Sequence, residues 1–250
     1  MGKLQKRKGW HRGIDMGLRK VLMTGLALIC SLGLVHSVFA FTWTEVGDAG
    51  DLLATAQIPV GEGPLTSISG MLALVFNSDS GSPIDADMYR IFIADPLAFS
   101  ATTVGLTSLD TQLFLFTQFG MGVYANDDCT PGLVGCPLSG DVVQSTLPPG
   151  LPSGFGSDIY YLVVTSFDLD PVSLGGPIFP NDPTNQVYGP TGPGGGFAIT
   201  EYSGFGTTGA YTIALTGVDD VPVPEPATLL LLGSGVAGVA WATRNRQRRK

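Results

Sequence analysis

Basic side chains are almost missing from the middle of the sequence. Residues 41–220 contain one basic residue, Arg90, and no lysine, and both histidines, His11 and His36, come earlier. A serine or cysteine nucleophile needs a histidine or lysine as its base, so this segment excludes the Ser–His, Cys–His and Ser–Lys dyads. Acidic residues are plentiful, so a carboxylate pair that hydrolyses glycans stays open. We predict that the segment is not an enzyme, with a carboxylate-pair hydrolase as the rival hypothesis.

The charge in this segment is of one sign. Nineteen of the twenty-one acidic residues lie in residues 41–220 against one basic residue, which gives about −18 there although the whole chain carries −8. A surface of this charge repels nucleic acid and anionic lipid, so neither is expected as a partner. It suits a protein that recruits divalent cations, and equally one that uses acids only for solubility.

The N-terminal residues have the features of an export signal. Seven basic residues precede an uncharged apolar run that ends at Val35, and Val-Phe-Ala follows up to Ala40. A basic region, an apolar region and a short cleavage motif are the three parts of a signal peptide. We therefore predict that residues 1–40 are a signal peptide that signal peptidase removes. Translation can start at Met1 or at Met16, which would give a signal of ordinary length.

Cysteine is scarce. Cys30 lies in the predicted signal peptide, which leaves Cys129 and Cys136 with six residues between them. In an oxidising compartment two such cysteines are expected to form a disulfide that closes a small loop. Zinc is a poor alternative, because the mature chain has no histidine to complete a site.

The last thirty residues, 221–250, combine three features. Pro222, Pro224 and Pro226 make a stiff extended segment, because proline fixes φ and lacks an amide hydrogen. An apolar run at 229–242 follows, short for a bilayer-spanning helix, and the chain ends in an arginine-rich tail. We predict a membrane helix whose basic end faces the cytoplasm.

This segment resembles the PEP-CTERM sorting signal of Gram-negative bacteria. The matching motif is Val223, Pro224, Glu225 and Pro226, followed by the apolar run and the basic tail. The resemblance implies that exosortase, a membrane protease, recognises and cleaves the segment. It also implies an inner-membrane-anchored precursor, then release to the cell surface or extracellular matrix, in association with exopolysaccharide. The alternative is an ordinary membrane anchor behind a proline linker.

Between the two ends, residues 41–220 are long enough for one domain with a single core. Short runs rich in valine, isoleucine, phenylalanine, tyrosine and threonine alternate with glycine- and proline-rich stretches, which predicts an all-β fold. We expect a single antiparallel β-sandwich, jelly-roll-like. The expected strands are 41–45, 65–74, 85–93 (an acidic turn that runs into a strand), 97–104, 109–116, 123–125, 157–164 and 209–217. Residues 168–196 are predicted to be an irregular loop.

Alternation along the strands predicts which faces are buried. Tyr89, Ile91 and Ile93 share one face of their strand, since successive side chains point to opposite faces. By the same rule Leu113 and Leu115 should face the core. Gln112, Phe114 and Phe116 should lie on the opposite face.

The spacing of these strands resembles the bacterial pre-peptidase C-terminal domain, a β-sandwich found as an accessory module in secreted proteins. The matching positions are Asp85, Asp87, Tyr89, Asp110, Thr111, Leu113, Leu115, Phe116, Asn126, Asp127, Asp128, Gly209, Tyr211 and Ile213. The resemblance implies a module that in some members binds calcium or an extracellular polymer and is not the catalytic unit.

Calcium is the one cofactor that the residues indicate, because hard cations take several oxygen ligands. The candidate ligands stand at strand ends and are Asp85, Asp87, Asp110, Asn126, Asp127 and Asp128. The alternative is that aspartate and asparagine serve turns by accepting local backbone hydrogen bonds.

Together these features predict an exported, non-catalytic surface or matrix protein, processed by exosortase, with a structural or adhesive role linked to exopolysaccharide. A calcium- or glycan-binding module is the alternative. Aromatic side chains that could contact a glycan are Phe119, Tyr124, Tyr202 and Phe205.

Overall fold

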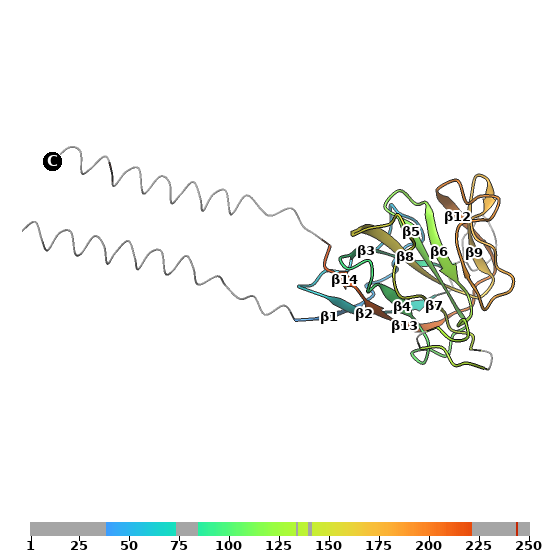
Figure 1. Cartoon of the computed structure of the whole chain (residues 1–250), viewed down its shortest axis with the longest axis horizontal. Helices are drawn as coiled ribbons and strands as arrows, with labels where there is room; N and C mark the ends of the chain where they lie inside the picture. The colour runs from blue at the N-terminus through green and yellow to red at the C-terminus, as the bar shows by residue number, and fades with distance from the viewer. Residues whose placement is uncertain (1–38, 74–84, 134, 140–141, 222–243, 245–250) are drawn as a thin grey trace, which may run out of the picture. The chain divides into compact units, whose positions relative to one another are not determined.

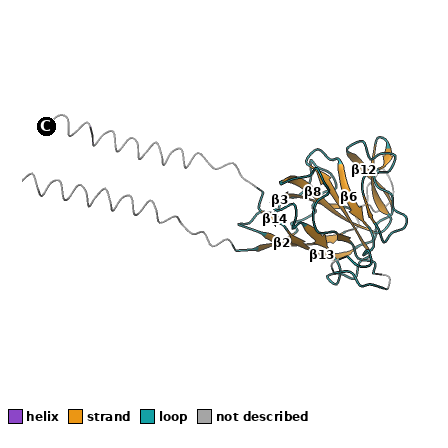
Figure 2. Ribbon diagram, in the orientation of Figure 1, coloured by secondary structure: helices purple, strands orange, loops and turns teal. Residues whose placement is uncertain are grey.

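A computed structural model describes residues 39–73, 85–133, 135–139, 142–221 and residue 244. Every secondary-structure element assigned within residues 39–221 is a strand (Figure 2). The all-β prediction is therefore confirmed. Within the described residues no helix is long and apolar enough to cross a membrane. The apolar runs of the predicted signal peptide and membrane helix lie outside the described residues.

The first sheet has five strands, in the order β1, β2, β13, β4, β7. These are β1 (Phe41–Thr44), β2 (Leu65–Leu72), β13 (Gly209–Thr216), β4 (Ser100–Thr102) and β7 (Thr146–Leu147). β1 and β2 are parallel, so the antiparallel prediction is wrong for this pair. The two strands are parallel because the chain between them returns to the start of β1. There the Phe41 amide donates to Pro64 O, just before β2 begins.

The second sheet has six strands, in the order β11, β6, β5, β8, β3, β14. These are β11 (Val187–Tyr188), β6 (Gly122–Asn126), β5 (Thr111–Thr117), β8 (Asp158–Ser166), β3 (Asp87–Ile93) and β14 (Val218–Asp219). All neighbours are antiparallel, and β8 lies between β5 and β3. The register places Leu162 of β8 beside both Leu115 and Tyr89. These long central strands carry the main core.

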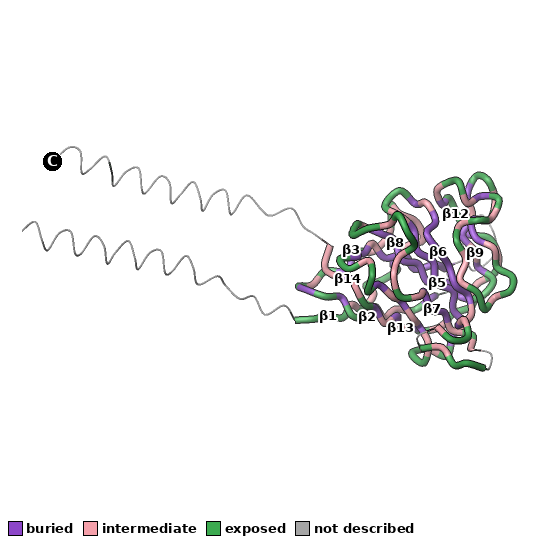
Figure 3. The backbone as a smooth tube through the Cα atoms, in the orientation of Figure 1, coloured by how far each residue is buried: buried purple, intermediate pink, exposed green. Residues whose placement is uncertain are grey.

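That core lies between the first and second sheets. Tyr89, Ile91 and Ile93 of β3, and Leu113 and Leu115 of β5, are buried in one apolar cluster that also includes side chains of β2 and β13. The predicted inward faces are therefore confirmed. Figure 3 shows the buried stretches concentrated on the central strands. Removing this apolar area from water is the main favourable contribution to folding.

A third sheet covers the other face of the second sheet. Its strands, in the order β10, β9, β12, are β10 (Gly176–Pro177), β9 (Leu169–Ser173) and β12 (Ile199–Gly204). Side chains from this region and from the outer face of β5 form a second buried cluster, which includes Phe114, Phe116, Phe179 and Tyr202. The Phe179 ring lies 5.7 Å from the rings of both Phe114 and Phe116.

Two sequence predictions are corrected by this layer. Residues 168–196 are not simply an irregular loop, because they contain β9, β10 and β11. In the described residues a third sheet also lies beside the two that enclose the main core, where the predicted sandwich had two sheets. The outer face of β5 was assigned correctly, but it is buried as well. Alternation identifies the side of a strand on which a residue lies, and it does not show whether another layer covers that side.

The predicted strand at 97–104 is only partly present. Residues 100–102 pair as β4, whereas residues 96–98 form a turn. Asp95 explains the turn, since its Oδ1 accepts hydrogen bonds from the amides of Leu97 at 3.0 Å and Ala98 at 3.2 Å. Aspartate often caps a turn in this way.

Both ends of the domain lie at one place. The Phe41 amide donates to Pro64 O at 2.8 Å, and the Asp220 amide donates to Gly63 O at 3.2 Å. Figure 1 shows β1 and β14 on the same side of the domain. The chain therefore enters and leaves the domain beside residues 63–64.

Candidate functional site

The six candidate calcium ligands do not meet at one point. Asp110, Asp127 and Asp128 each bring a carboxylate oxygen to within 4.8 Å of the others, and we call them the loop cluster. Asp87 instead meets Glu45 and Asp48 within the same distance. We call this second group, with the nearby Asp51 and Asp85, the N-terminal cluster.

The N-terminal cluster is assembled by the segment after β1. Gln57 forms a parallel bridge with Tyr89 of β3, and its amide donates to the carbonyls of Ala49 and Met88. The Met88 amide in turn donates to Gly50 O at 3.0 Å. These backbone bonds hold residues 45–57 against the start of β3. Glu45, which follows β1, and Asp87, which begins β3, are thereby brought together.

Buried partners surround Asp87 in this cluster. Its side chain is fully buried, and its Oδ2 accepts the Tyr211 hydroxyl at 2.5 Å. The Tyr89 and Tyr211 hydroxyl oxygens are 2.6 Å apart, and Tyr89 is the donor because Tyr211 gives its proton to Asp87. A Cβ at Gly70 would collide with Tyr211 Oη and Glu45 Oε2, so glycine leaves room for this network.

Burial governs the protonation of the N-terminal cluster. Desolvation raises the pKa of Asp87 to about 8, opposed by the Tyr211 hydrogen bond and reinforced by the Glu45 charge. Desolvation also raises the pKa of Asp85 to about 7. Asp87 Oδ1 is buried and has no hydrogen-bond partner among the described residues.

The loop cluster is built by a hairpin. β5 and β6 pair in antiparallel register, with Leu113 opposite Asn126. Asp110 immediately precedes β5, and Asp127 and Asp128 immediately follow β6, so all three lie at the open end of the hairpin. Such geometry requires no long-range fold beyond the hairpin itself.

Buried carboxylate oxygens of Asp110 and Asp127 in the loop cluster have no hydrogen-bond partner among the described residues. Asp127 is 7% exposed, and neither of its carboxylate oxygens has a hydrogen-bond partner. Asp110 Oδ1 is also buried and unpartnered. Only Asp128 is engaged, since its Oδ2 accepts the Thr184 hydroxyl.

Like charges and burial act together in the loop cluster. Desolvation, followed by the charges of Asp128 and Asp110, raises the pKa of Asp127 to about 8. Desolvation, then the Asp128 charge, raises the pKa of Asp110 to about 6. An unpaired buried carboxylate costs several kcal/mol unless it takes up a proton or a cation. The loop cluster therefore needs a proton or a cation to offset its buried charge.

Asn126 serves the fold beside this cluster. Its Nδ2 donates to Gln186 O at 3.0 Å, and its Oδ1 accepts the Thr146 amide at 2.7 Å. These bonds join β6 to β7 and to the segment before β11. The side-chain oxygen of Asn126 is thus committed to the backbone.

A disulfide closes the loop that begins next to Asp128. Cys129 and Cys136 are bonded, with their Cα atoms 5.6 Å apart. The Cys129 amide donates to Val142 O, and the Asp128 amide donates to Thr184 O. The covalent bond restricts the loop on one side of the loop cluster, while Thr184 holds the other side.

Family and structure comparisons identify one segment. The model of the PEP-CTERM protein-sorting motif matches residues 222–247. The chain carries a PEP-CTERM sorting motif. No curated protein and no solved structure gives a significant match to the chain. The resemblance of the strands to the pre-peptidase C-terminal domain therefore stays a prediction.

The PEP-CTERM match indicates an exported protein that is targeted by exosortase and begins as a membrane-anchored precursor in Gram-negative bacteria. The matched range contains Val223, Pro224, Glu225 and Pro226. These four residues lie outside the described part of the structure, so no geometry is given for them.

The aromatic residues considered for glycan contact divide into two kinds. Phe119 is 74% exposed and Phe205 is 66% exposed, but Tyr124 and Tyr202 are buried. The expectation that all four can reach a glycan is therefore wrong for the two tyrosines, whose rings fill the two cores. Sequence alternation alone could not reveal this burial.

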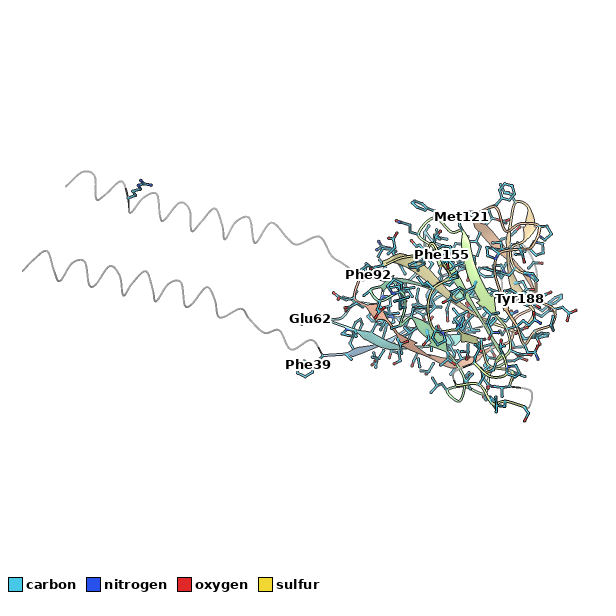
Figure 4. The ribbon with its side chains drawn as sticks, viewed as in Figure 1. Phe39, Glu62, Phe92, Met121, Phe155 and Tyr188 are labelled. Atoms are coloured by element: carbon cyan, nitrogen blue, oxygen red, sulfur yellow. A yellow bond between two sulfur atoms is a disulfide. The ribbon has the colours of Figure 1, made fainter. Side chains whose placement is uncertain are left out.

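An apolar pocket of about 540 Å³ lies beside β6. Its wall includes Tyr124, Pro148, Leu151, Pro152, Phe155 and Val187, and Figure 4 labels Phe155. The Tyr124 hydroxyl is buried and has no hydrogen-bond partner. No carboxylate lines this pocket, so it does not present the acid pair of a glycan hydrolase.

Proposed function

We propose that exosortase cleaves this protein within or next to its Pro-Glu-Pro motif and releases the β domain to the cell surface or extracellular matrix. There the domain has a non-catalytic structural or adhesive role linked to exopolysaccharide. The observation that carries this proposal is the PEP-CTERM match at residues 222–247. The export signal predicted for residues 1–40 is consistent with it.

The arrangement of the domain supports processing at both ends. Phe41 and Asp220 lie beside the same two residues, Gly63 and Pro64. In a precursor held by the segment after residue 220, the two ends of the domain, Phe41 and Asp220, would therefore lie at one side of it. Removal of either segment leaves the two cores intact, because their residues come from within residues 49–218.

Two observations support a non-catalytic role. Residues 41–220 contain no histidine or lysine, and the two cysteines form a disulfide. Nucleophile–base pairs that depend on these residues are therefore not available. The buried acids stand in clusters away from the lining of the apolar pocket. Glycan hydrolysis that is lost when one acid is replaced would favour the hydrolase instead.

Intact mass of the protein from its native cells tests the proposal. The released fraction should contain a chain that starts at Phe41 and ends near Pro224–Ala227. Glu225→Ala should leave the chain uncleaved and cell-associated, because the motif loses its only charge. Glu62→Ala removes the same side chain from an exposed position of the domain, labelled in Figure 4, and should be processed normally.

Two results would decide against parts of the proposal. A wild-type chain that retains Lys250 in every fraction would show that the C-terminal segment is only an anchor. If the released domain does not co-sediment with exopolysaccharide from the same cells, the adhesive role is wrong while the sorting step stands.

A further inference from the structure

We propose that the loop cluster is a calcium site in which Asp110, Asp127 and Asp128 are the side-chain ligands. The inference does not rest on the proposed sorting or on the polysaccharide role. It rests on the environment of these three carboxylates within the described structure.

The first argument is the buried, unpartnered carboxylate. Asp127 is more than nine-tenths buried, and both of its oxygens lack a donor. One of these oxygens lies within 4.8 Å of oxygens of Asp110 and Asp128. Buried polar groups in folded proteins nearly always have a partner, so these oxygens point to one that is not a protein group.

The second argument is the distribution of positive charge. Arg90 is the only basic residue of residues 41–220, and it lies on β3. β8 separates β3 from β5, at whose start the loop cluster lies. Because the domain brings no basic side chain of its own to the cluster, a cation from solution is the natural counter-charge.

The third argument separates a cation from a proton. In the N-terminal cluster, Asp87 has a protein donor, because its Oδ2 accepts the Tyr211 hydroxyl at 2.5 Å. In the loop cluster no hydrogen bond joins Asp127 to a neighbouring carboxyl group. A proton on Asp127 would therefore find no acceptor, whereas a cation between the three carboxylates contacts all of them.

The spacing of the oxygens fits calcium. Calcium–oxygen distances are about 2.3–2.6 Å, so two ligands of one calcium ion lie at most about 5 Å apart. The separations within 4.8 Å fit this range. Magnesium needs a tighter octahedron and keeps several waters, which the buried Asp127 leaves little room for. Asp110 and Asp128 are half-buried, so water can complete the coordination.

Calcium here would link three segments of the chain. Asp110 belongs to the segment before β5, and Asp127 and Asp128 lead into the disulfide-closed loop. Through the Thr184 hydroxyl, Asp128 also holds the segment before β11. An exported protein meets calcium at concentrations that suit sites with dissociation constants of about 0.1–1 mM.

The test is thermal unfolding of the full-length chain in detergent, in chelator and in about 10 mM CaCl₂ or MgCl₂. Calcium should raise Tm by about 5 °C, and magnesium by clearly less, because a ligand that binds only the folded state stabilises it by mass action. Asp127→Asn should abolish the calcium shift. Asp48→Asn, which removes one charge from the N-terminal cluster, should retain it.

Every alternative result overturns the proposal. These are no calcium shift in the wild type, an equal shift with magnesium, an unchanged shift in Asp127→Asn, or a shift lost in Asp48→Asn. Folding of Asp127→Asn is checked in chelator, where it should be at least as stable as the wild type because it lacks an unpaired buried charge. If that variant does not fold, the half-buried Asp128→Asn replaces it, with at least a tenfold loss of calcium affinity by calorimetry expected.

Discussion

The two acidic clusters have similar composition but differ in how the protein satisfies them. In the N-terminal cluster, Asp87 is fully buried and accepts the Tyr211 hydroxyl through Oδ2, while its Oδ1 has no hydrogen-bond partner. In the loop cluster, Asp127 is nearly as buried and bonded to nothing. Burial of an acid is therefore not by itself a sign of a ligand site. The informative difference is whether the surrounding protein supplies a donor or a place for a proton.

The largest expected effect that tests this comparison is the change of Tm with pH, measured in the presence of chelator. The pKa of Asp87 is about 8 in the folded protein against an ordinary 3.8. Between these values the folded state keeps a proton that the unfolded state releases, so the stabilisation is full below about pH 4 and is lost as the pH rises to about 8. Each unit of raised pKa corresponds to about 1.4 kcal/mol, so Tm should be several degrees lower at pH 8.5 than at pH 5.5.

Adding calcium to the same measurement distinguishes the contributions of the two clusters. It should remove the part of the pH dependence that comes from the loop cluster, because ligand binding replaces the protons there. Asp87→Asn should remove the part that comes from Asp87 and leave the part that comes from Asp85. A Tm that increases from pH 5.5 to pH 8.5 in chelator would contradict both assignments.

Alanine substitutions of the two buried aspartates should differ in chelator. Asp87→Ala removes the acceptor of the Tyr211 hydroxyl and leaves that hydroxyl buried, which should cost about 2–3 kcal/mol of unfolding free energy. Asp127→Ala removes a carboxylate with no partner and should change stability by less than about 1 kcal/mol. Urea unfolding at pH 7 measures both. Equal losses in the two variants would mean that the clusters are satisfied alike.

The smallest expected effect concerns the tyrosine pair of the N-terminal cluster. Tyr211 Oη is hydrogen-bonded to both Asp87 and Tyr89, whereas Tyr89 Oη is hydrogen-bonded to Tyr211. Tyr211→Phe should therefore cost about 2 kcal/mol, and Tyr89→Phe about 1 kcal/mol. The same urea experiment measures both variants. A larger loss of unfolding free energy from Tyr89→Phe than from Tyr211→Phe would show that the hydroxyl groups donate their hydrogen bonds in a different order.

The loop cluster could largely be predicted from the sequence. Asp110 stands before one strand, Asp127 and Asp128 follow the next, and Gly120 lies in the turn between them. A hairpin brings its two open ends together, so strand order alone predicts their approach. That neither Asp127 oxygen has a partner could not be predicted, because it depends on loops that arrive from elsewhere.

The N-terminal cluster could not be predicted in this way. Glu45 and Asp87 are separated by more than forty residues, and no motif connects them. Their approach depends on Gln57, whose backbone pairs with β3 through hydrogen bonds to Met88 and Arg90. Glu45 and Asp48 were therefore missing from the candidate ligands. Local patterns carry no information on such a long-range bridge.

By itself the sequence determined the sorting motif, the acidic character of residues 41–220 and the all-β class, because each depends on composition or on the order of neighbouring residues. Only the tertiary structure decided that Phe114 and Phe116 lie under a third sheet and that Asp87 accepts the Tyr211 hydroxyl while Asp127 accepts no hydrogen bond. The reason is physical: burial and hydrogen-bond satisfaction depend on which segments pack together, and packing joins residues that are distant in the chain.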